Sequence, residues 1–230
     1  AVEAVEKHFD TGPSCVLQMA CRTGKTPVAC DIIARALDRD PAGTRVLYLV
    51  PSLQLLRQTA QKLHGYMSGK WHMILVGSDP KPVQFAMHHA DGRVTTTEIS
   101  MSTNPQLMSA DPVGGVIVVS TYKSSNQIPL NWATLTVFDE CHRTTCNNPL
   151  KDEKNRRFQL HLTGGKGRRL FMTATPVTSG HISMSNKSLY GPTVYRYHLQ
   201  AGIAANHVNP YRLELVAGPP RILRTPEWIE

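Results

Sequence analysis

The sequence predicts an α/β fold with a mostly parallel central sheet, for two reasons. Short runs rich in valine, isoleucine and leucine alternate with longer stretches of helical periodicity, the order typical of parallel strands joined by crossover helices. Most of these short runs are apolar along their whole length, as strands buried on both faces are. The composition, 41% hydrophobic and 18% charged over 230 residues, is that of a globular protein with a substantial core.

The predicted strands and helices alternate along the chain. In the helix predicted after the first strand, Val28, Ile32 and Ile33 recur at helical spacing, so one face can pack on the sheet. The chain starts within a predicted helix and without methionine, which suggests a fragment. The predicted helices cover residues 1–9, 25–37 and 53–64. The predicted strands cover residues 15–19, 46–50, 73–76, 116–120, 135–138 and 170–173.

The remaining segments have weaker patterns. Residues 79–103 are polar and are predicted to be an insertion or a pair of edge strands, and 146–169 a solvated helix followed by a basic turn. Beyond Pro176, strands are expected over 191–199 and 211–217. We expect one domain over residues 1–200, and a C-terminal extension or linker over 201–230.

Charge and cysteine content narrow the classes of partner and compartment. A formal net charge of +8 favours a polyanionic partner, nucleic acid first. Five cysteines without repeated spacing indicate reduced thiols in the cytoplasm, and the stretch CHRTTC lacks the paired CxxC of a zinc site. No apolar run is long enough to cross a bilayer, so no membrane partner is expected.

The stretch MACRTGKTP, residues 19–27, has the features of a phosphate-binding loop. It joins a predicted strand to a predicted helix, where backbone N–H groups and the helix dipole favour a phosphate. In such a loop Gly24 lets the backbone approach closely, Lys25 neutralises the phosphates and Thr26 ligates Mg²⁺. The full G-x-x-x-x-G-K-[ST] pattern is not met, since Met19 occupies the first glycine position, and a chance triplet is the alternative.

Two acids, Asp139 and Glu140, follow directly after an apolar predicted strand. A carboxylate in this place can hold Mg²⁺, and its neighbour can orient an attacking water. Because parallel strands deliver their carboxyl ends to one edge of a sheet, we expect both acids beside Lys25. Solvated acids in an ordinary turn are the alternative reading, but the loop and the acids together are rarer by chance than either alone.

Five segments, in order, resemble the motifs of superfamily 2 helicases and translocases. After the GKT loop, VPSLQLLRQT (50–59) resembles motif Ia, VVSTYKS (118–124) motif Ib, DECH (139–142) motif II and FMTATP (171–176) motif III. The style is similar to DEAD/DEAH-type helicase subunits of restriction systems and their phage or plasmid relatives. The resemblance implies an N-terminal RecA-like domain, a P-loop three-layer α/β sandwich. It also implies hydrolysis of ATP with Mg²⁺ to move on or unwind nucleic acid, DNA rather than RNA.

The same resemblance implies roles for individual residues. Glu140 is implied as the general base, and His142 as the link from the ATP site to motif III. A polar cap of a turn is the alternative for His142, and strand-end packing for the motif III threonines. Arg22 replaces the usual glycine, so it must avoid a positive φ or accept roughly 1–2 kcal/mol of strain, and we expect the site to tolerate it. ATP binding is implied for Arg22, Thr23, Gly24, Lys25 and Thr26, Mg²⁺ binding for Thr26 and Asp139, and coupling for Thr173 and Thr175.

Motifs Ia and Ib face nucleic acid in this family and contact its phosphates rather than its bases. Each residue alone is a weak prediction, because Arg57, for example, also suits a solvated helix face. A basic turn at residues 166–169 is a further but weaker candidate, more typical of a solvated loop. The residues implied are Ser52, Gln54, Arg57, Thr121, Tyr122 and Lys123.

Helicases of this kind close ATP between two RecA-like domains, and the second supplies an arginine finger. Motifs IV to VI and an upstream glutamine motif have no counterpart in the sequence. We therefore expect a weakly active fragment that works with a second RecA-like domain, and the resemblance allows an attached nuclease or methyltransferase module. A non-catalytic nucleic-acid-binding module with the same fold is the main alternative. A P-loop kinase or GTPase is disfavoured by the ordered motifs.

Overall fold

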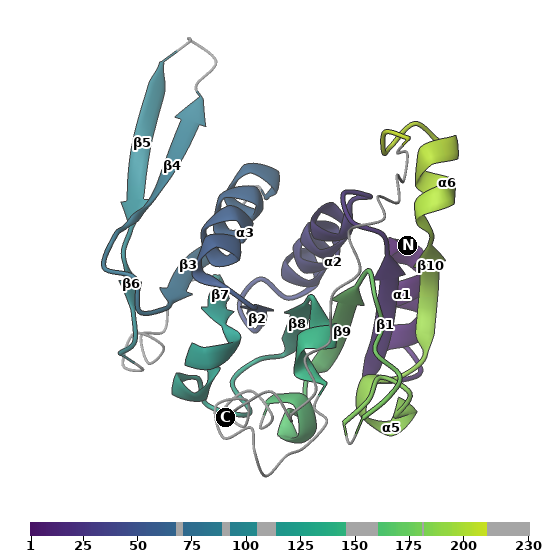
Figure 1. Ribbon diagram of the computed structural model, residues 1–230. Coiled ribbons are helices and arrows are strands. Elements are labelled where there is room, and N and C mark those ends of the chain that lie inside the picture. Colours follow the sequence, from purple (N-terminus) through teal and green to yellow (C-terminus); the bar gives the residue numbers. More distant parts are fainter. Residues whose placement is uncertain (68–70, 89–92, 105–113, 146–160, 181, 211–230) are drawn as a thin grey trace, which may run out of the picture.

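The computed structural model describes residues 1–67, 71–88, 93–104, 114–145, 161–180 and 182–210. In this part of the chain, eight strands form one sheet in the order β10-β1-β9-β8-β2-β7-β3-β6, and every neighbouring pair is parallel (Figure 1). The predicted parallel sheet is therefore confirmed. The strands are β1 (Ser14–Met19), β2 (Arg45–Val50), β3 (Trp71–Val76), β6 (Met101–Ser102), β7 (Gly115–Thr121), β8 (Leu135–Asp139), β9 (Arg168–Thr173) and β10 (Thr193–Tyr197).

Helices and short helical turns cover both faces of this sheet, which gives the predicted three-layer sandwich. The long helices pack on one face, and two 3₁₀ helices with α5 pack on the other. A short helix, α6 (Leu199–Ala204), follows β10. The first layer contains α1 (Val2–Phe9), α2 (Lys25–Arg39) and α3 (Leu53–Tyr66), and the third contains η2 (Tyr122–Gln127), η3 (Cys141–Thr144) and α5 (Lys187–Tyr190).

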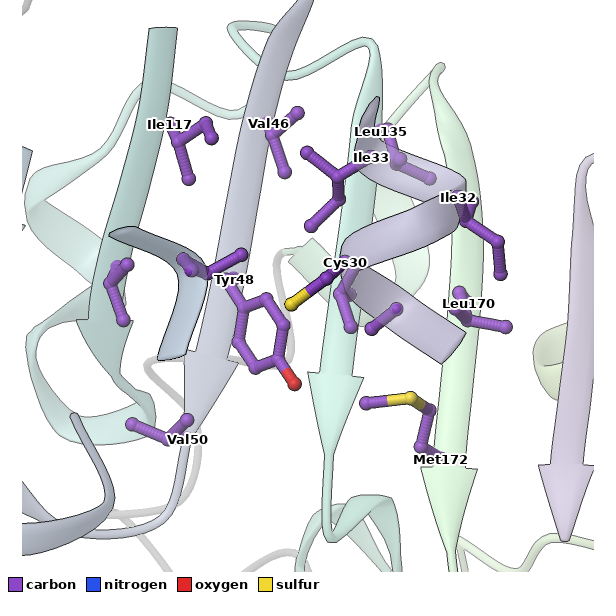
Figure 2. Packing of buried hydrophobic residues seen from close by; sticks show 14 of the residues in the cluster. Cys30, Ile32, Ile33, Val46, Tyr48, Val50, Ile117, Leu135, Leu170 and Met172 are labelled. Carbon is purple, nitrogen blue, oxygen red and sulfur yellow. The ribbon is translucent and has the colours of Figure 1, made fainter. Parts of the chain in front are cut away.

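The central strand β2 shows why the strands are apolar along their whole length. Val46, Tyr48 and Val50 belong to the core on the side of α2 and α3, whereas Leu47 and Leu49 belong to the core on the other side. Because side chains alternate between the two faces of a strand, both sets must be apolar when helical layers cover both faces. Figure 2 shows the first of these cores, with Cys30 of α2 facing the Tyr48 ring.

The polar segment after β3 forms a separate antiparallel pair, β4 (Val83–His88) and β5 (Val94–Ile99), which projects beside α3 (Figure 1). The prediction of two strands is confirmed, although they lie outside the main sheet. Phe85 anchors the pair, its ring centroid 4.9 Å from that of His64 on α3. This contact explains why a hairpin of polar composition stays against the domain.

The C-terminal part of the described chain adds an edge to the sheet. The strand predicted over 191–199 is β10, which pairs with β1. Helix α6 crosses residue 200, and the division into a domain of 1–200 and an extension stays a prediction. The strand predicted over 211–217, and most of the solvated segment predicted over 146–169, lie outside the described residues.

Candidate functional site

Five of the sequence motifs meet at the carboxyl edge of the sheet. The GKT loop follows β1, the two acids end β8, and motif III follows β9, which lies between β1 and β8. In parallel α/β sheets this edge is where ligands bind. The prediction that the acids lie beside the lysine is confirmed by an ion pair between Lys25 Nζ and Glu140 Oε1 at 3.5 Å.

The loop before α2 has an unusual backbone at two positions. Gly24 precedes the helix with φ of +100°, and the space where a side chain would begin holds no atom within 4 Å. Thr23 closes the turn, as its hydroxyl donates to the Ala20 carbonyl at 2.7 Å. Arg22 has φ of +63°, so it takes the left-handed conformation that glycine adopts at roughly 1–2 kcal/mol less cost. The exposed Arg22 side chain therefore sits on a strained backbone.

Lys25 is a buried cation with few partners. Only 9% of the residue is exposed, and its ammonium donates one long hydrogen bond, 3.3 Å, to the Met19 carbonyl. Among the described residues, Glu140 supplies a second contact at 3.5 Å. An ammonium has three donors, and a buried charge is costly unless it is paired and hydrogen-bonded. The geometry therefore leaves Lys25 able to bind an anion at the open side of the loop.

Asp139 is buried at the end of β8, with only 7% of the residue exposed. Its Oδ1 accepts a hydrogen bond from the Glu140 N–H at 3.0 Å. Burial, together with the neighbouring charge of Glu140, raises the pKa of Asp139 to about 6, and Lys25 partly offsets the rise. A carboxylate in this environment gains from a cation that neutralises it.

Glu140 connects the lysine to His142. It has φ of +50°, and its two carboxylate oxygens lie 3.5 Å from Lys25 Nζ and 3.4 Å from His142 Nδ1. His142 Nδ1 also lies 3.0 Å from the Thr173 hydroxyl oxygen, which accepts a hydrogen bond from the Thr175 N–H at 3.1 Å. Burial lowers the pKa of His142, which favours the neutral ring at pH 7. The residues predicted to couple motifs II and III are therefore in contact.

Comparison with known proteins identifies the family. Residues 1–178 match the family model described as the type III restriction enzyme, res subunit. The chain belongs to this family. It is 39% identical over 207 residues to the probable helicase A859L of African swine fever virus, isolate Pig/Kenya/KEN-50/1950, and 37% identical over 204 residues to the protein of the same name from isolate Tick/Malawi/Lil 20-1/1983. Both alignments cover 89% of this chain and 22% of the relative, so the chain spans about a fifth of these viral proteins.

Solved structures show the same fold. The DNA-bound nuclease-deletion mutant of the type ISP restriction-modification enzyme LlaGI superposes with a TM-score of 0.68 at 24% identity, covering 90% of this chain and 20% of that one. The helicase domain of Pyrococcus furiosus Hef gives a TM-score of 0.57 at 18% identity, covering 94% and 41% of the two chains. Together with the family match and the viral helicase relatives, this fold identifies the chain as an N-terminal RecA-like domain of the superfamily 2 helicase type.

The site of this domain suits Mg²⁺ bound to a nucleotide. The candidate ligands are a hydroxyl and carboxylates, the oxygen donors that Mg²⁺ prefers. Thr26, in the first turn of α2, and Asp139 are linked through a third residue that the sequence reading missed. Tyr48 lies with its hydroxyl 3.5 Å from Asp139 Oδ2, and a hydrogen bond with Thr26 also acts on its pKa. The sequence feature that could have pointed to Tyr48 is a tyrosine within the aliphatic run of β2.

The residues predicted to contact nucleic acid follow β2 and β7, whose ends Val50 and Thr121 pair in register at the same carboxyl edge. Ser52 caps α3 by accepting a hydrogen bond from the Leu55 N–H, and Thr121 caps η2 in the same way through the Ser124 N–H. The side chains of Ser52, Gln54 and Lys123 are exposed. These three can therefore reach a ligand that lies across this edge.

The structure corrects one predicted contact and gives another predicted contact partners within the chain. Tyr122 is only 5% exposed and its hydroxyl donates to the Asp139 carbonyl at 2.7 Å, so it is a core residue beneath motif II and not a nucleic-acid contact. Arg57 is engaged within the chain, because its guanidinium binds Asp79 Oδ2 at 2.7 Å and the carbonyls of Lys81 and Pro82. These contacts tie α3 to the segment before β4.

The basic turn before β9 lies at the opposite edge of the sheet from motifs Ia and Ib, because β9 begins there at Arg168. The Arg168 guanidinium lies 5.4 Å from the centre of the Phe9 ring, and Arg169 donates to the Leu162 carbonyl. The turn therefore packs on α1 and does not extend the predicted nucleic-acid surface. Among the described helices, none is long and apolar enough to cross a membrane.

Proposed function

We propose that this domain binds Mg·ATP and is the ATP-hydrolysing half of a DNA helicase or translocase. The observation that carries the proposal is Lys25, a buried ammonium held by one long hydrogen bond and one 3.5 Å ion pair beside two carboxylates. A triphosphate at the open side of the loop completes the partners of this cation, and the N–H groups at the start of α2 bind its oxygens.

Each residue has a separate task in this mechanism. Lys25 neutralises the phosphates, while Thr26 and Asp139 hold Mg²⁺, which screens the charge that develops on the phosphates. Glu140 accepts the proton of the attacking water, and its contacts with Lys25 and His142 set the direction of its carboxylate. Contact between His142 and Thr173 transmits the state of this carboxylate to motif III.

Nucleic acid is proposed to lie across the ends of β2 and β7. Ser52, Gln54 and Lys123 offer a hydroxyl, an amide and a cation there, the groups that bind phosphates without reading bases. DNA is favoured over RNA because restriction-enzyme structures with the same fold are DNA complexes. The net charge of +8 supports a polyanionic partner.

A second RecA-like domain that supplies an arginine finger is proposed to complete the site, as the resemblance to superfamily 2 helicases implies. A nuclease or methyltransferase module is a proposed neighbour because a solved relative is a nuclease-deletion form of a restriction-modification enzyme. Placement in the cytoplasm stays a prediction from the cysteine content.

The test is DNA-stimulated ATP hydrolysis by this domain joined to a second RecA-like domain. Glu140→Gln removes the base and keeps the shape, so we expect hydrolysis to fall by roughly a hundredfold or more while Mg·ATP still binds. Glu98→Gln, on the projecting β5 strand, is the matched control and leaves hydrolysis unchanged. Hydrolysis by Glu140→Gln equal to that of the unmutated protein contradicts the proposal. ATP binding without DNA-stimulated hydrolysis in the unmutated protein favours the non-catalytic module.

A further inference from the structure

Tyr48 is a buried phenol aimed at the candidate magnesium site. It lies in the middle of β2, has 0% exposure, and is flanked by β8 and β7 in the sheet. Its ring points from β2 towards α2 (Figure 2), which carries Thr26 in its first turn. A buried tyrosine hydroxyl needs a hydrogen-bond partner, and a leucine or valine would fill an aliphatic strand without that requirement. A structural role alone therefore does not explain why a hydroxyl is present at this position.

The partners of the Tyr48 hydroxyl are the two residues proposed to hold Mg²⁺. It lies 3.5 Å from Asp139 Oδ2, and hydrogen bonding with the Thr26 side chain also acts on it. Asp139 Oδ1 is held separately by the Glu140 N–H at 3.0 Å. Each oxygen of the carboxylate thus has its own partner, one in the backbone of motif II and one on β2.

The separation of 3.5 Å is longer than the ~2.7 Å typical of a hydroxyl–oxygen hydrogen bond. The hydroxyl therefore touches the carboxylate at the limit of bonding distance. Because the phenol is fully buried, turning the Asp139 carboxylate away from it costs this hydrogen bond without replacement by water, which favours the observed orientation of the carboxylate.

We propose that Tyr48 is a positioning residue that orients the Asp139 carboxylate towards Mg²⁺. The inference rests on the proposed function and extends it to a residue on β2, outside the helicase motifs. Tyr48 does not contact the nucleotide in this account. Its hydroxyl reduces the number of orientations that the Asp139 carboxylate can adopt, and this preorganisation favours metal binding.

Tyr122 provides a matched control, because it also contacts Asp139. It is also a buried tyrosine next to Asp139, but its hydroxyl donates to the Asp139 main-chain carbonyl at 2.7 Å and not to the carboxylate. Tyr48→Phe and Tyr122→Phe each delete one buried oxygen close to Asp139. Only the first deletes a contact with the side chain that is proposed to bind the metal.

The experiment is thermal unfolding of the 230-residue chain at fixed ATP with increasing Mg²⁺, and the readout is the Mg²⁺ concentration at half of the maximal stabilisation. We expect Tyr48→Phe to raise this concentration roughly three- to tenfold, the effect of losing one hydrogen bond. Unfolding without Mg²⁺ reports any loss of the fold by itself. Tyr48→Met, which also lacks the hydroxyl, is expected to raise the Mg²⁺ requirement similarly and serves if the phenylalanine variant is poorly folded.

The outcomes separate this inference from the proposed function. A normal Mg²⁺ requirement in Tyr48→Phe or Tyr48→Met, with the unmutated chain stabilised by Mg·ATP, overturns the role of Tyr48 and leaves the proposed function intact. An equal rise in Tyr122→Phe also overturns it, since the effect is then one of general packing. Absence of Mg·ATP stabilisation in the unmutated chain overturns both.

Discussion

The imidazole Nδ1 of His142 lies 3.0 Å from the hydroxyl oxygen of Thr173, and this contact joins the end of β8 to the end of β9. On one side His142 reaches Glu140, and through it Lys25. On the other side the Thr173 hydroxyl accepts a hydrogen bond from the Thr175 N–H. A continuous set of polar contacts thus runs from the proposed phosphate site to motif III.

Thr173→Val tests whether this contact transmits the state of the nucleotide. Valine has nearly the shape of threonine, so the strand end is retained while the hydroxyl is lost. We expect Mg·ATP to bind normally but to change the affinity for single-stranded DNA roughly fivefold less than in the unmutated protein, as allosteric coupling of this size is typical. The measurement is DNA binding by fluorescence anisotropy with and without Mg·ATP. An unchanged linkage in Thr173→Val means that the hydrogen bond is structural only.

The pKa of Asp139, raised to about 6 by burial and by Glu140, predicts a pH-dependent stability. The folded protein binds a proton here that the unfolded chain releases near pH 4, so this contribution is present at low pH and is lost as pH rises through 6. The loss amounts to about 3 kcal/mol of unfolding free energy. Asp139→Asn cannot titrate, so the difference in unfolding free energy between the two proteins should fall by about 3 kcal/mol from pH 3 to pH 7. Urea unfolding curves that keep a constant difference contradict this.

Variants of Arg22 separate the effect of backbone strain in the phosphate loop from the effect of the guanidinium charge. Arg22→Gly relieves the left-handed backbone, worth roughly 1–2 kcal/mol, but loses part of this gain to the greater freedom of glycine in the unfolded chain. Arg22→Ala removes the guanidinium and keeps the strain. We expect the glycine variant to be at least as stable as the unmutated protein and the alanine variant to be less stable than the glycine variant. Calorimetric titration with Mg·ATP then shows whether the guanidinium binds phosphate, because both variants lose affinity equally if it does.

Arg57 has two candidate roles, one structural and one in binding nucleic acid, and a pair of variants distinguishes them. It ties α3 to Asp79 through a 2.7 Å ion pair, and the motif resemblance assigns it to nucleic acid. If it contacts a phosphate, Arg57→Ala reduces the slope of log affinity against log salt by about 1, whereas Asp79→Ala does not. If Arg57→Ala and Asp79→Ala bind DNA equally across a salt series, Arg57 has only the structural role. We expect this second result because the Arg57 guanidinium already binds Asp79 and two carbonyls within the chain.

Much of the fold was predictable because burial leaves a strong pattern. Strands such as β2 and β8 lie between two helical layers, so their runs of apolar residues stand out in the sequence. The hairpin β4–β5 was harder, since its polar strands are anchored mainly through Phe85 and the pattern gave only a choice between insertion and edge strands. The pairing of β10 with β1 depends on contacts distant in sequence, which no local pattern contains.

Local sequence patterns also predicted only part of the site. Lys25, Asp139 and His142 follow motifs whose spacing fixes their chemistry, and the structure brings them together. Tyr122 was assigned from its motif, but its direction depends on how η2 packs over β8, and the side chain is buried. Tyr48 was missed because its importance comes from a neighbour that lies far away in sequence.

The most direct test of the account is the stabilisation of the chain by Mg·ATP in thermal unfolding, compared between the unmutated protein, Lys25→Ala and the exposed-helix control Lys62→Ala. At nucleotide concentrations about a hundredfold above the dissociation constant, binding adds roughly 2.7 kcal/mol to the unfolding free energy. We predict this rise for the unmutated protein and Lys62→Ala, and its loss in Lys25→Ala. Equal stabilisation of all three proteins, or stabilisation of none, contradicts a triphosphate site at Lys25.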